Sequence, residues 1–177
     1  FPLKHRVEAF GFVFREKPAD RNIIKEKIEE FSIPSCMIPG IKKGRDFVTS
    51  DGKVIKNKDI TVPPPEPLSY AYCSDTMYFA GLSSFVKNVD LLYHEATFDA
   101  SMTKLARKVM HSTTLDAAKT ALKANAKALM IGHFSARYDN VTTLVEEART
   151  IFPATIPAID GNTYNIRELS ARNRLHD

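Results

Sequence analysis

An α/β fold is predicted by three observations on this chain of 177 residues. Short apolar runs of strand length alternate with amphipathic stretches of helix length. Several of the apolar runs end in polar residues, which is how open α/β sheets usually carry their sites. The hydrophobic fraction of 44% and the charged fraction of 26% are those of an ordinary globular protein.

The first part of the chain contains the signals of a strand, a helix and a hairpin. Residues 7–15 alternate around Gly11 and predict a strand, with His5 just before it. Asp20 is expected to cap a helix over residues 21–31, which Pro34 would end. Residues 46–48 and 53–55 are expected to pair as a hairpin, because the turn between them closes with an Asp-Gly pair.

The second part of the chain follows a regular α/β pattern. Strands are predicted at residues 68–73, 89–93 and 128–131, and helices at 81–86, 101–110, 115–125 and 142–151. Either Thr113 or Thr114 is expected to cap the helix at 115–125. Residues 155–159 and 164–169 are predicted to be edge strands, or a strand and a tail.

Residues 35–67 depart from the α/β pattern and end in a cluster of prolines. A run within this excursion is rich in basic residues, namely Lys42, Lys43, Arg45, Lys53, Lys56 and Lys58. Such a run predicts either a solvated surface or a basic protrusion that binds phosphates. A net charge of +4 and a pI near 9.0 permit a nucleic-acid partner but do not require one.

Several classes of protein are disfavoured by the sequence. No apolar run approaches the roughly 18 residues of a membrane span, and no secretory signal is evident. Cys36 and Cys73 lie far apart, which fits reduced thiols and a cytoplasmic location better than a disulfide framework. The chain begins at Phe1, and we therefore expect it to be a piece of a longer protein.

Metal-type side chains follow three of the predicted strands. Asp75 comes after residues 68–73, His94 and Glu95 come after 89–93, and His133 comes after 128–131. We expect Gly132 to free the backbone that delivers His133. Parallel strands would bring these side chains to one edge, and imidazole with carboxylate is a ligand set for zinc. A single histidine at a strand end is usually structural, so it is the set that indicates a site.

Four segments resemble ribonuclease Z, the tRNA 3′-processing endoribonuclease of the metallo-β-lactamase superfamily. They read Y-C-S-D-T (72–76), L-L-Y-H-E-A-T-F (91–98), H-S-T-T (111–114) and G-H-F-S-A-R-Y (132–138), in the order and spacing seen in that family. The opening H-R-V-E-A-F-G-F (5–12) is similar to the family's segment around a zinc-ligating histidine. The resemblance implies half of a four-layer αβ/βα sandwich, with a mixed sheet and an inserted arm at about residues 21–67.

The resemblance also implies a role for each motif residue. His5 and His133 would each ligate one of two zinc ions, and Asp75 would bridge the two ions, which together activate water for attack on a phosphodiester. His111 would protonate the leaving O3′ oxygen, with Glu95 oriented towards it. A carboxylate beside an imidazole suits this role because it stabilises the protonated ring.

The remaining implied roles concern binding and support. The arm would grip precursor tRNA through its basic residues, and a polar pair would lie near the scissile or a neighbouring phosphate. His94 is better explained as a buried residue that supports the metal ligands from behind than as a metal ligand itself. These residues are Lys42, Lys43 and Arg45 in the arm, Ser135 and Arg137 at the phosphate, and His94 in the interior.

Departures from the family's pattern shape the prediction. The main zinc motif, H-x-H-x-D-H, is absent, so residues 1–177 are expected to be the C-terminal part of a longer enzyme and to be inactive alone. The expected partners are the missing N-terminal half and a second subunit of a homodimer. No Gly-Pro motif is obvious in residues 33–44 of the arm. Two alternatives remain: another phosphodiesterase of the superfamily, and an RNA-binding module without catalysis.

Overall fold

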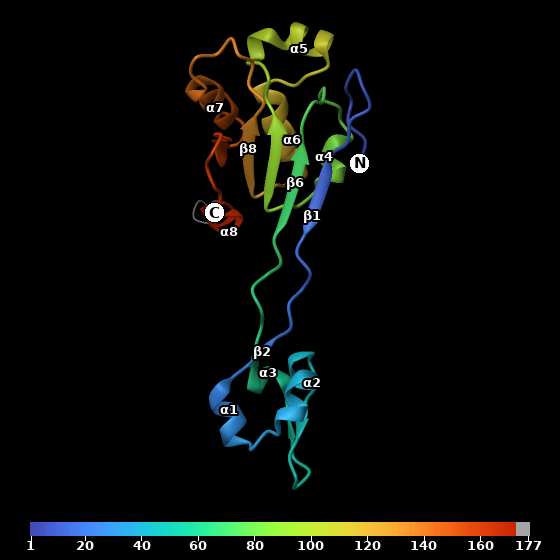
Figure 1. The fold of residues 1–177 in the computed structure, drawn as a ribbon, viewed down its shortest axis with the longest axis vertical. Helices are drawn as coiled ribbons and strands as arrows, with labels where there is room; N and C mark the ends of the chain where they lie inside the picture. The colour runs from blue at the N-terminus through green and yellow to red at the C-terminus, as the bar shows by residue number, and fades with distance from the viewer. Residues whose placement is uncertain (173–177) are drawn as a thin grey trace. The chain divides into compact units, whose positions relative to one another are not determined.

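The computed structural model describes residues 1–172, and the chain divides into two compact units. The body comprises residues 1–15 and the chain from residue 68 onward, and the arm comprises residues 16–67. Figure 1 follows the chain through both units by colour. Each unit has its own hydrophobic core and is described separately.

The body is built on one five-stranded sheet with the strand order β1-β6-β7-β8-β9. These strands are β1 (Phe12–Arg15), β6 (Ser69–Cys73), β7 (Leu91–Glu95), β8 (Ala128–Gly132) and β9 (Thr155–Pro157). The edge strand β1 is antiparallel to β6, whereas β6, β7, β8 and β9 are mutually parallel. The predicted mixed sheet and the parallel arrangement of its three site-bearing strands are confirmed.

Helices connect the parallel strands, and one more helix follows the last strand. They are α4 (Leu82–Phe85), the 3-10 turn Ala100–Met102 leading into α5 (Thr103–Val109), α6 (Thr114–Ala124), α7 (Thr142–Arg149) and α8 (Ile166–Arg172). Thr113 caps α6 in a reciprocal capping box with Asp116, which satisfies two otherwise unpaired amides at the helix start. Figure 1 shows α5 beyond the ends at which the arrows of the parallel strands point.

The two faces of the body sheet are covered differently. Alternate residues of the strands, including Ala71, Leu92 and Leu129, pack against α4, α6 and α7 in the main core. On the opposite face, Leu91 and Met130 pack with α8 and the segment before it. The same face remains open over β1 and β6, where Phe12 and Phe14 are 54% and 58% exposed.

The arm is a small unit with a core of its own. Its elements are β2 (Asn22–Ile23), α1 (Lys25–Glu30), the 3-10 turn Ser35–Met37, α2 (Ile38–Lys42), β3 (Phe47–Val48), β4 (Val54–Ile55), α3 (Asn57–Ile60) and β5 (Thr61–Val62). Ile33, Ile41, Phe47, Ile55 and Ile60 form the buried cluster. The predicted hairpin is confirmed, with Phe47 opposite Ile55 across the Asp-Gly turn.

Three sequence-based expectations about the elements are wrong. The first strand begins at Phe12 rather than residue 7, because the chain bends at residues 5–7 on its way to the sheet. Asp20 caps no helix: α1 begins at Lys25, and the residues before it pair with β5 instead. Residues 164–169 form no strand, since Ile166 and Leu169 use helical spacing to pack on the sheet.

Candidate metal and acid-base site

The candidate site lies where the parallel strands of the body end. Asp75 follows β6, Glu95 is the last residue of β7, and His133 follows β8. Asp75 and His133 leave their strands with positive φ angles of 54° and 59°, a conformation that costs a residue other than glycine about 1 kcal/mol. Such strain is commonly found where a fold aims side chains at a site.

Gly132 is required for a different reason from the one expected. His133, rather than Gly132, adopts the left-handed conformation. A Cβ on Gly132 would lie 2.6 Å from the Tyr93 hydroxyl oxygen, so any larger residue would clash with that ring. The glycine therefore leaves room for the Tyr93 ring just before His133.

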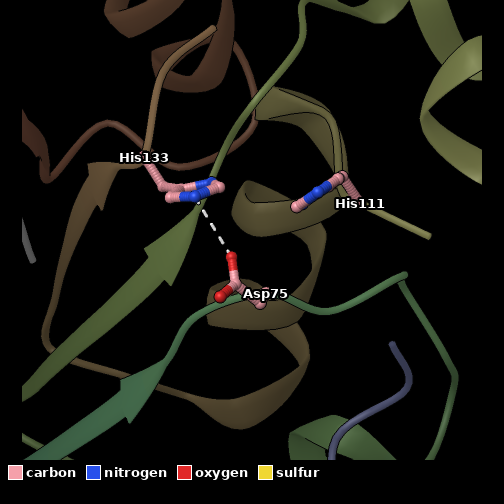
Figure 2. A group of neighbouring side chains, drawn as sticks. All are labelled: Asp75, His111 and His133. Carbon is pink, nitrogen blue, oxygen red and sulfur yellow. Dashed lines mark ion pairs between the residues drawn. The ribbon is translucent and has the colours of Figure 1, made fainter. Parts of the chain in front are cut away.

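Three side chains converge closely enough to hold a metal ion. Asp75, His111 and His133 each offer a ligand atom, and these atoms lie within 4.8 Å of one another. Nε2 of His133 lies 3.1 Å from Oδ1 of Asp75 (Figure 2), and that buried oxygen has no hydrogen-bond partner. Two ligand atoms that face each other without a hydrogen bond fit a shared cation between them.

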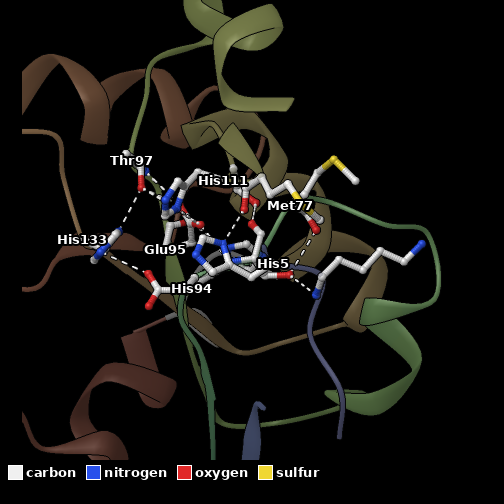
Figure 3. Close-up of polar contacts among 12 residues, drawn as sticks. His5, Met77, His94, Glu95, Thr97, His111 and His133 are labelled. Carbon is white, nitrogen blue, oxygen red and sulfur yellow. Dashed lines mark hydrogen bonds and ion pairs between the residues drawn. The ribbon is translucent and has the colours of Figure 1, made fainter. Parts of the chain in front are cut away.

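His5 reaches the same region from the N-terminal segment. Its ring lies 4.9 Å from that of His111, centroid to centroid, and the His111 ring lies 5.3 Å from that of His133. The neighbouring Lys4 fixes this segment, because its amide donates to Thr76 Oγ1 and its carbonyl accepts from the amide of Met77. The three imidazoles therefore form a row along the edge of the sheet (Figure 3).

Each imidazole of the row is anchored through Nδ1. The Nδ1 atom of His5 lies 3.0 Å from the Met110 carbonyl, that of His111 lies 2.8 Å from Glu95 Oε1, and that of His133 lies 2.9 Å from Thr97 Oγ1. A carbonyl or carboxylate at Nδ1 fixes the proton on that nitrogen and leaves Nε2 to bind a metal or carry a proton. This is the arrangement that metal ligands and acid-base residues need.

Glu95 is fully buried and supports the row from behind. Its Oε1 accepts from the amide of Thr76 and faces His111, and its Oε2 accepts from the amide and the hydroxyl of Thr97. The carboxylate does not reach the solvent, so it acts on the site through these neighbours. The expected pairing of Glu95 with His111 is thus present.

His94 lies behind the site, as expected of a supporting residue. It is fully buried, and its Nδ1 donates to the Glu95 carbonyl at 2.6 Å. Burial lowers the pKa of His94, so its ring stays neutral. The neighbouring Cys73 thiol is buried on the same side, and burial raises its pKa to about 12, which leaves no thiolate ligand there.

The loop after His133 is held rigidly against the turn after Glu95. The amide of Ser135 donates to the Thr97 carbonyl, and the Tyr138 hydroxyl donates to Asp99 at 2.8 Å. Arg137 donates to Ser135 Oγ, and its guanidinium lies 5.0 Å from the centre of the Phe98 ring. Ser135 and Arg137 are therefore held in place next to the histidine row, and the Arg137 side chain is exposed.

The arm residues lie in the other unit. Lys43 and Arg45 are exposed and Lys42 is half-buried, all at or just after the end of α2. Lys56 forms an ion pair with Asp46 at 3.0 Å, so its charge is partly neutralised within the basic run.

Thr97 and Thr76 are the site residues that the sequence reasoning missed. Their position in the turns directly after β7 and β6 is the signal that would have found them.

Comparison with known proteins gives sequence and structural relatives. No family model matches the chain. It is 45% identical over 160 residues to ribonuclease Z of Parabacteroides distasonis and 44% identical over 157 residues to that of Porphyromonas gingivalis. These matches cover 90% and 89% of this chain but 53% and 52% of the relatives, so the chain spans about half the length of the proteins it matches.

Solved structures agree on the fold. The chain aligns with human tRNase Z, short form, at a TM-score of 0.51 and 22% identity, over 94% of this chain and 41% of that one. A long form RNase Z from yeast aligns at a TM-score of 0.52 and 25% identity, over 63% of this chain and 15% of that one. The expected metallo-β-lactamase fold is thereby confirmed.

Proposed function

This chain is a homologue of ribonuclease Z over about nine-tenths of its length, and from this premise we propose that it forms part of a zinc-dependent endoribonuclease that removes the 3′ trailer of precursor tRNA. The observation that carries the proposal is the meeting of Asp75, His111 and His133 at one edge of the sheet. Metal-assisted phosphodiester hydrolysis uses metal ligands and a proton donor side by side, and this edge offers both.

Zinc would be held here by His5, Asp75 and His133. Their donor set is two imidazoles and a carboxylate, which zinc accepts, and the unpaired Oδ1 of Asp75 supports its role as a ligand. When bound, zinc would polarise a phosphoryl oxygen and activate water. The remaining ligands would come from an H-x-H-x-D-H stretch on a polypeptide segment outside this chain.

His111 would supply the proton to the leaving O3′ oxygen. Its Nδ1 is held by Glu95 Oε1 at 2.8 Å, so Nε2 is the atom that meets the substrate. The side chain of His111 is 13% exposed, whereas that of Glu95 is fully buried. The carboxylate therefore orients the ring and stabilises its protonated form, while the ring alone contacts the substrate.

Precursor tRNA would contact the chain at two places. Arg137, already fixed over Phe98 and bonded to Ser135, presents a guanidinium for a phosphate close to the cut. Lys42, Lys43 and Arg45 would bind phosphates of the tRNA body through the arm. A cytoplasmic location is consistent with the two free cysteines, Cys36 and Cys73.

The open face of the body sheet would receive the other half of the enzyme. Phe12 and Phe14 stack with centroids 6.3 Å apart and are more than half exposed, and Tyr72 beside them is 36% exposed. An aromatic face of this kind is usually covered by a partner. We infer that the N-terminal half packs there, and that the complete enzyme works as a homodimer.

Cleavage of a precursor tRNA tests the proposal. The chain extended upstream by its own coding sequence should release the 3′ trailer, and the 177-residue chain should not. Hydrolysis of bis(p-nitrophenyl) phosphate without cleavage of tRNA would instead indicate another phosphodiesterase. Binding of tRNA without cleavage by the extended chain would indicate a non-catalytic RNA-binding module.

A further inference from the structure

The Thr97 side chain contacts both the metal-ligand side and the acid-base side of the site. Its hydroxyl oxygen lies 2.9 Å from Nδ1 of His133 and 2.7 Å from Oε2 of Glu95 (Figure 3). Thr97 is 7% exposed. We propose that Thr97 is a positioning residue that fixes the tautomer and orientation of His133 and couples it to the Glu95–His111 pair.

The Thr97 hydroxyl has a single proton, so it can donate to only one of its two neighbours. A hydroxyl donates one hydrogen bond and accepts others. Glu95 Oε2 is the stronger acceptor of the two neighbours because it belongs to a carboxylate, and it is also the nearer. Thr97 therefore donates to Glu95 and accepts from His133. His133 must then carry its proton on Nδ1, which leaves a lone pair on Nε2.

The opposite side of the His133 ring supports the same tautomer. Nε2 faces Asp75 Oδ1 at 3.1 Å, yet that oxygen takes part in no hydrogen bond. The two atoms are close enough to form an ion pair when the ring is protonated, but a proton on Nε2 of the neutral ring would not be aligned for a hydrogen bond to that oxygen. The geometry instead leaves both atoms with lone pairs aimed at a common point, as two ligands of one cation require.

The backbone of Thr97 reinforces the position of its hydroxyl. Its amide donates to the same Glu95 oxygen at 3.2 Å, and its carbonyl accepts from the amide of Ser135 in the loop after His133. The turn after β7 and the loop after β8 are thus joined at this residue. His111 Nδ1 lies 3.4 Å from the hydroxyl and is bonded to the other Glu95 oxygen, so a shift of Thr97 would disturb both histidines.

The test is the tautomer of His133 in the metal-free chain, read from the ¹⁵N shifts of its ring at about pH 8.5, where a free imidazole is neutral. The wild-type chain should carry the proton on Nδ1. Thr97→Val, which keeps the shape but lacks the hydroxyl, should move the proton to Nε2. Thr97→Ser, which keeps the hydroxyl, should restore Nδ1 protonation.

Thr120→Val is the matched control. Thr120 is also buried in the body, but its hydroxyl donates to the Asp116 carbonyl within α6 and does not contact the site. This variant should leave the His133 tautomer unchanged. If Thr97→Val does not fold, Thr97→Ala, which also lacks the hydroxyl, takes its place, with the same expected shift of the proton to Nε2. Protonation of Nε2 in the wild-type chain, or an unchanged tautomer in folded Thr97→Val, would overturn the proposal.

A second measurement extends the inference to the metal and rests on the proposed function. In the chain extended upstream, Thr97→Val should weaken zinc affinity about 10- to 100-fold in competition with a chelator, and Thr97→Ser should restore most of it. Equal affinity in Thr97→Val would contradict the positioning role. Failure of the wild-type enzyme to cleave tRNA would count against the proposed function alone, because the tautomer measurement needs neither metal nor substrate.

Discussion

Strand β7 starts beside one buried carboxylate, Asp90, and ends at another, Glu95. Asp90 accepts from the amide and the hydroxyl of Ser69, each at 2.7 Å, and forms an ion pair with Lys127 at 2.6 Å. Glu95 also accepts from amides and a hydroxyl, but the charged side chain beside it is His111. One carboxylate meets a permanent cation and the other meets a group that gains and loses a proton.

The difference separates a structural end of the sheet from a functional one. The ion pair of Asp90 with Lys127 and its hydrogen bonds from Ser69 hold the starts of β6, β7 and β8 together. His111 has its Nε2 directed into the site while its Nδ1 is held. Two buried carboxylates that accept similar numbers of hydrogen bonds can therefore have different roles, depending on the charged side chain beside each.

Replacement of His111 gives the largest expected effect. In the complete enzyme, His111→Ala should lower turnover by roughly two to four orders of magnitude, as expected for loss of a general acid. Zinc content should stay the same, as measured by metal analysis of the purified variant. Asp90→Asn, at the other end of the strand, should leave turnover unchanged. Loss of zinc from His111→Ala would mean that the residue is a ligand and not the proton donor.

Replacement of Asp90 should act on stability alone. Asp90→Ala leaves the buried amide of Ser69 without its acceptor, and we expect the free energy of unfolding to fall by about 2 kcal/mol. Urea denaturation of the wild-type and variant chains measures this. A variant as stable as the wild type would show that the Asp90 cluster does not hold this end of the sheet.

The two ends should also respond differently to pH. The pKa of His94 lies below its ordinary value of 6.5 because the ring is buried, so below about pH 6.5 the unfolded chain binds a proton that the folded chain does not. Stability should therefore fall as the pH decreases from 6.5, by at most about 1.4 kcal/mol per pH unit. His94→Asn, which keeps a donor for the Glu95 carbonyl, should flatten this slope in urea titrations between about pH 5 and pH 7.

Asp90 contributes in a lower pH window. Burial raises the pKa of Asp90, but the hydrogen bonds from Lys127 and Ser69 outweigh it, and the net pKa lies below the ordinary value of 3.8. Its stabilisation is present above that value and is lost as the pH falls through the folded pKa. A slope between pH 5 and pH 7 that survives in His94→Asn would therefore need another titrating group.

Charge reversal at arm cations that lack a carboxylate partner gives the smallest expected effect. In the part of the chain that the structure describes, Lys42, Lys43 and Arg45 form no ion pair, in contrast to Lys127. Reversal of these three charges should weaken tRNA binding and reduce its salt slope by about two to three. Reversal of Lys17 and Lys25, exposed cations of the arm outside the run, is the control. An unchanged slope would mean that the arm binds tRNA elsewhere.

Much of the body could be predicted from the sequence, because its strands are continuous apolar runs and its site residues follow them directly. The convergence of Asp75, Glu95 and His133 follows from the parallel order of β6, β7 and β8. The position of Thr97 directly after β7 can be read from the sequence, but the contact of its hydroxyl with His133 could not be predicted, since it depends on the distance between two turns that are far apart in sequence. The arm was harder still: the start of α1 is displaced because Ile23 pairs with Thr61, a contact that local pattern does not encode.

The central claim is that the edge formed by Asp75, His111 and His133 is half of a zinc-dependent nuclease site. Its most direct test measures zinc content and precursor tRNA cleavage together, on this chain and on the chain extended upstream, with Asp75→Ala in the longer form as control. We predict about two zinc ions and release of the 3′ trailer in the longer form alone, both lost in Asp75→Ala. A longer form that binds tRNA but holds no metal and cleaves nothing would contradict the account.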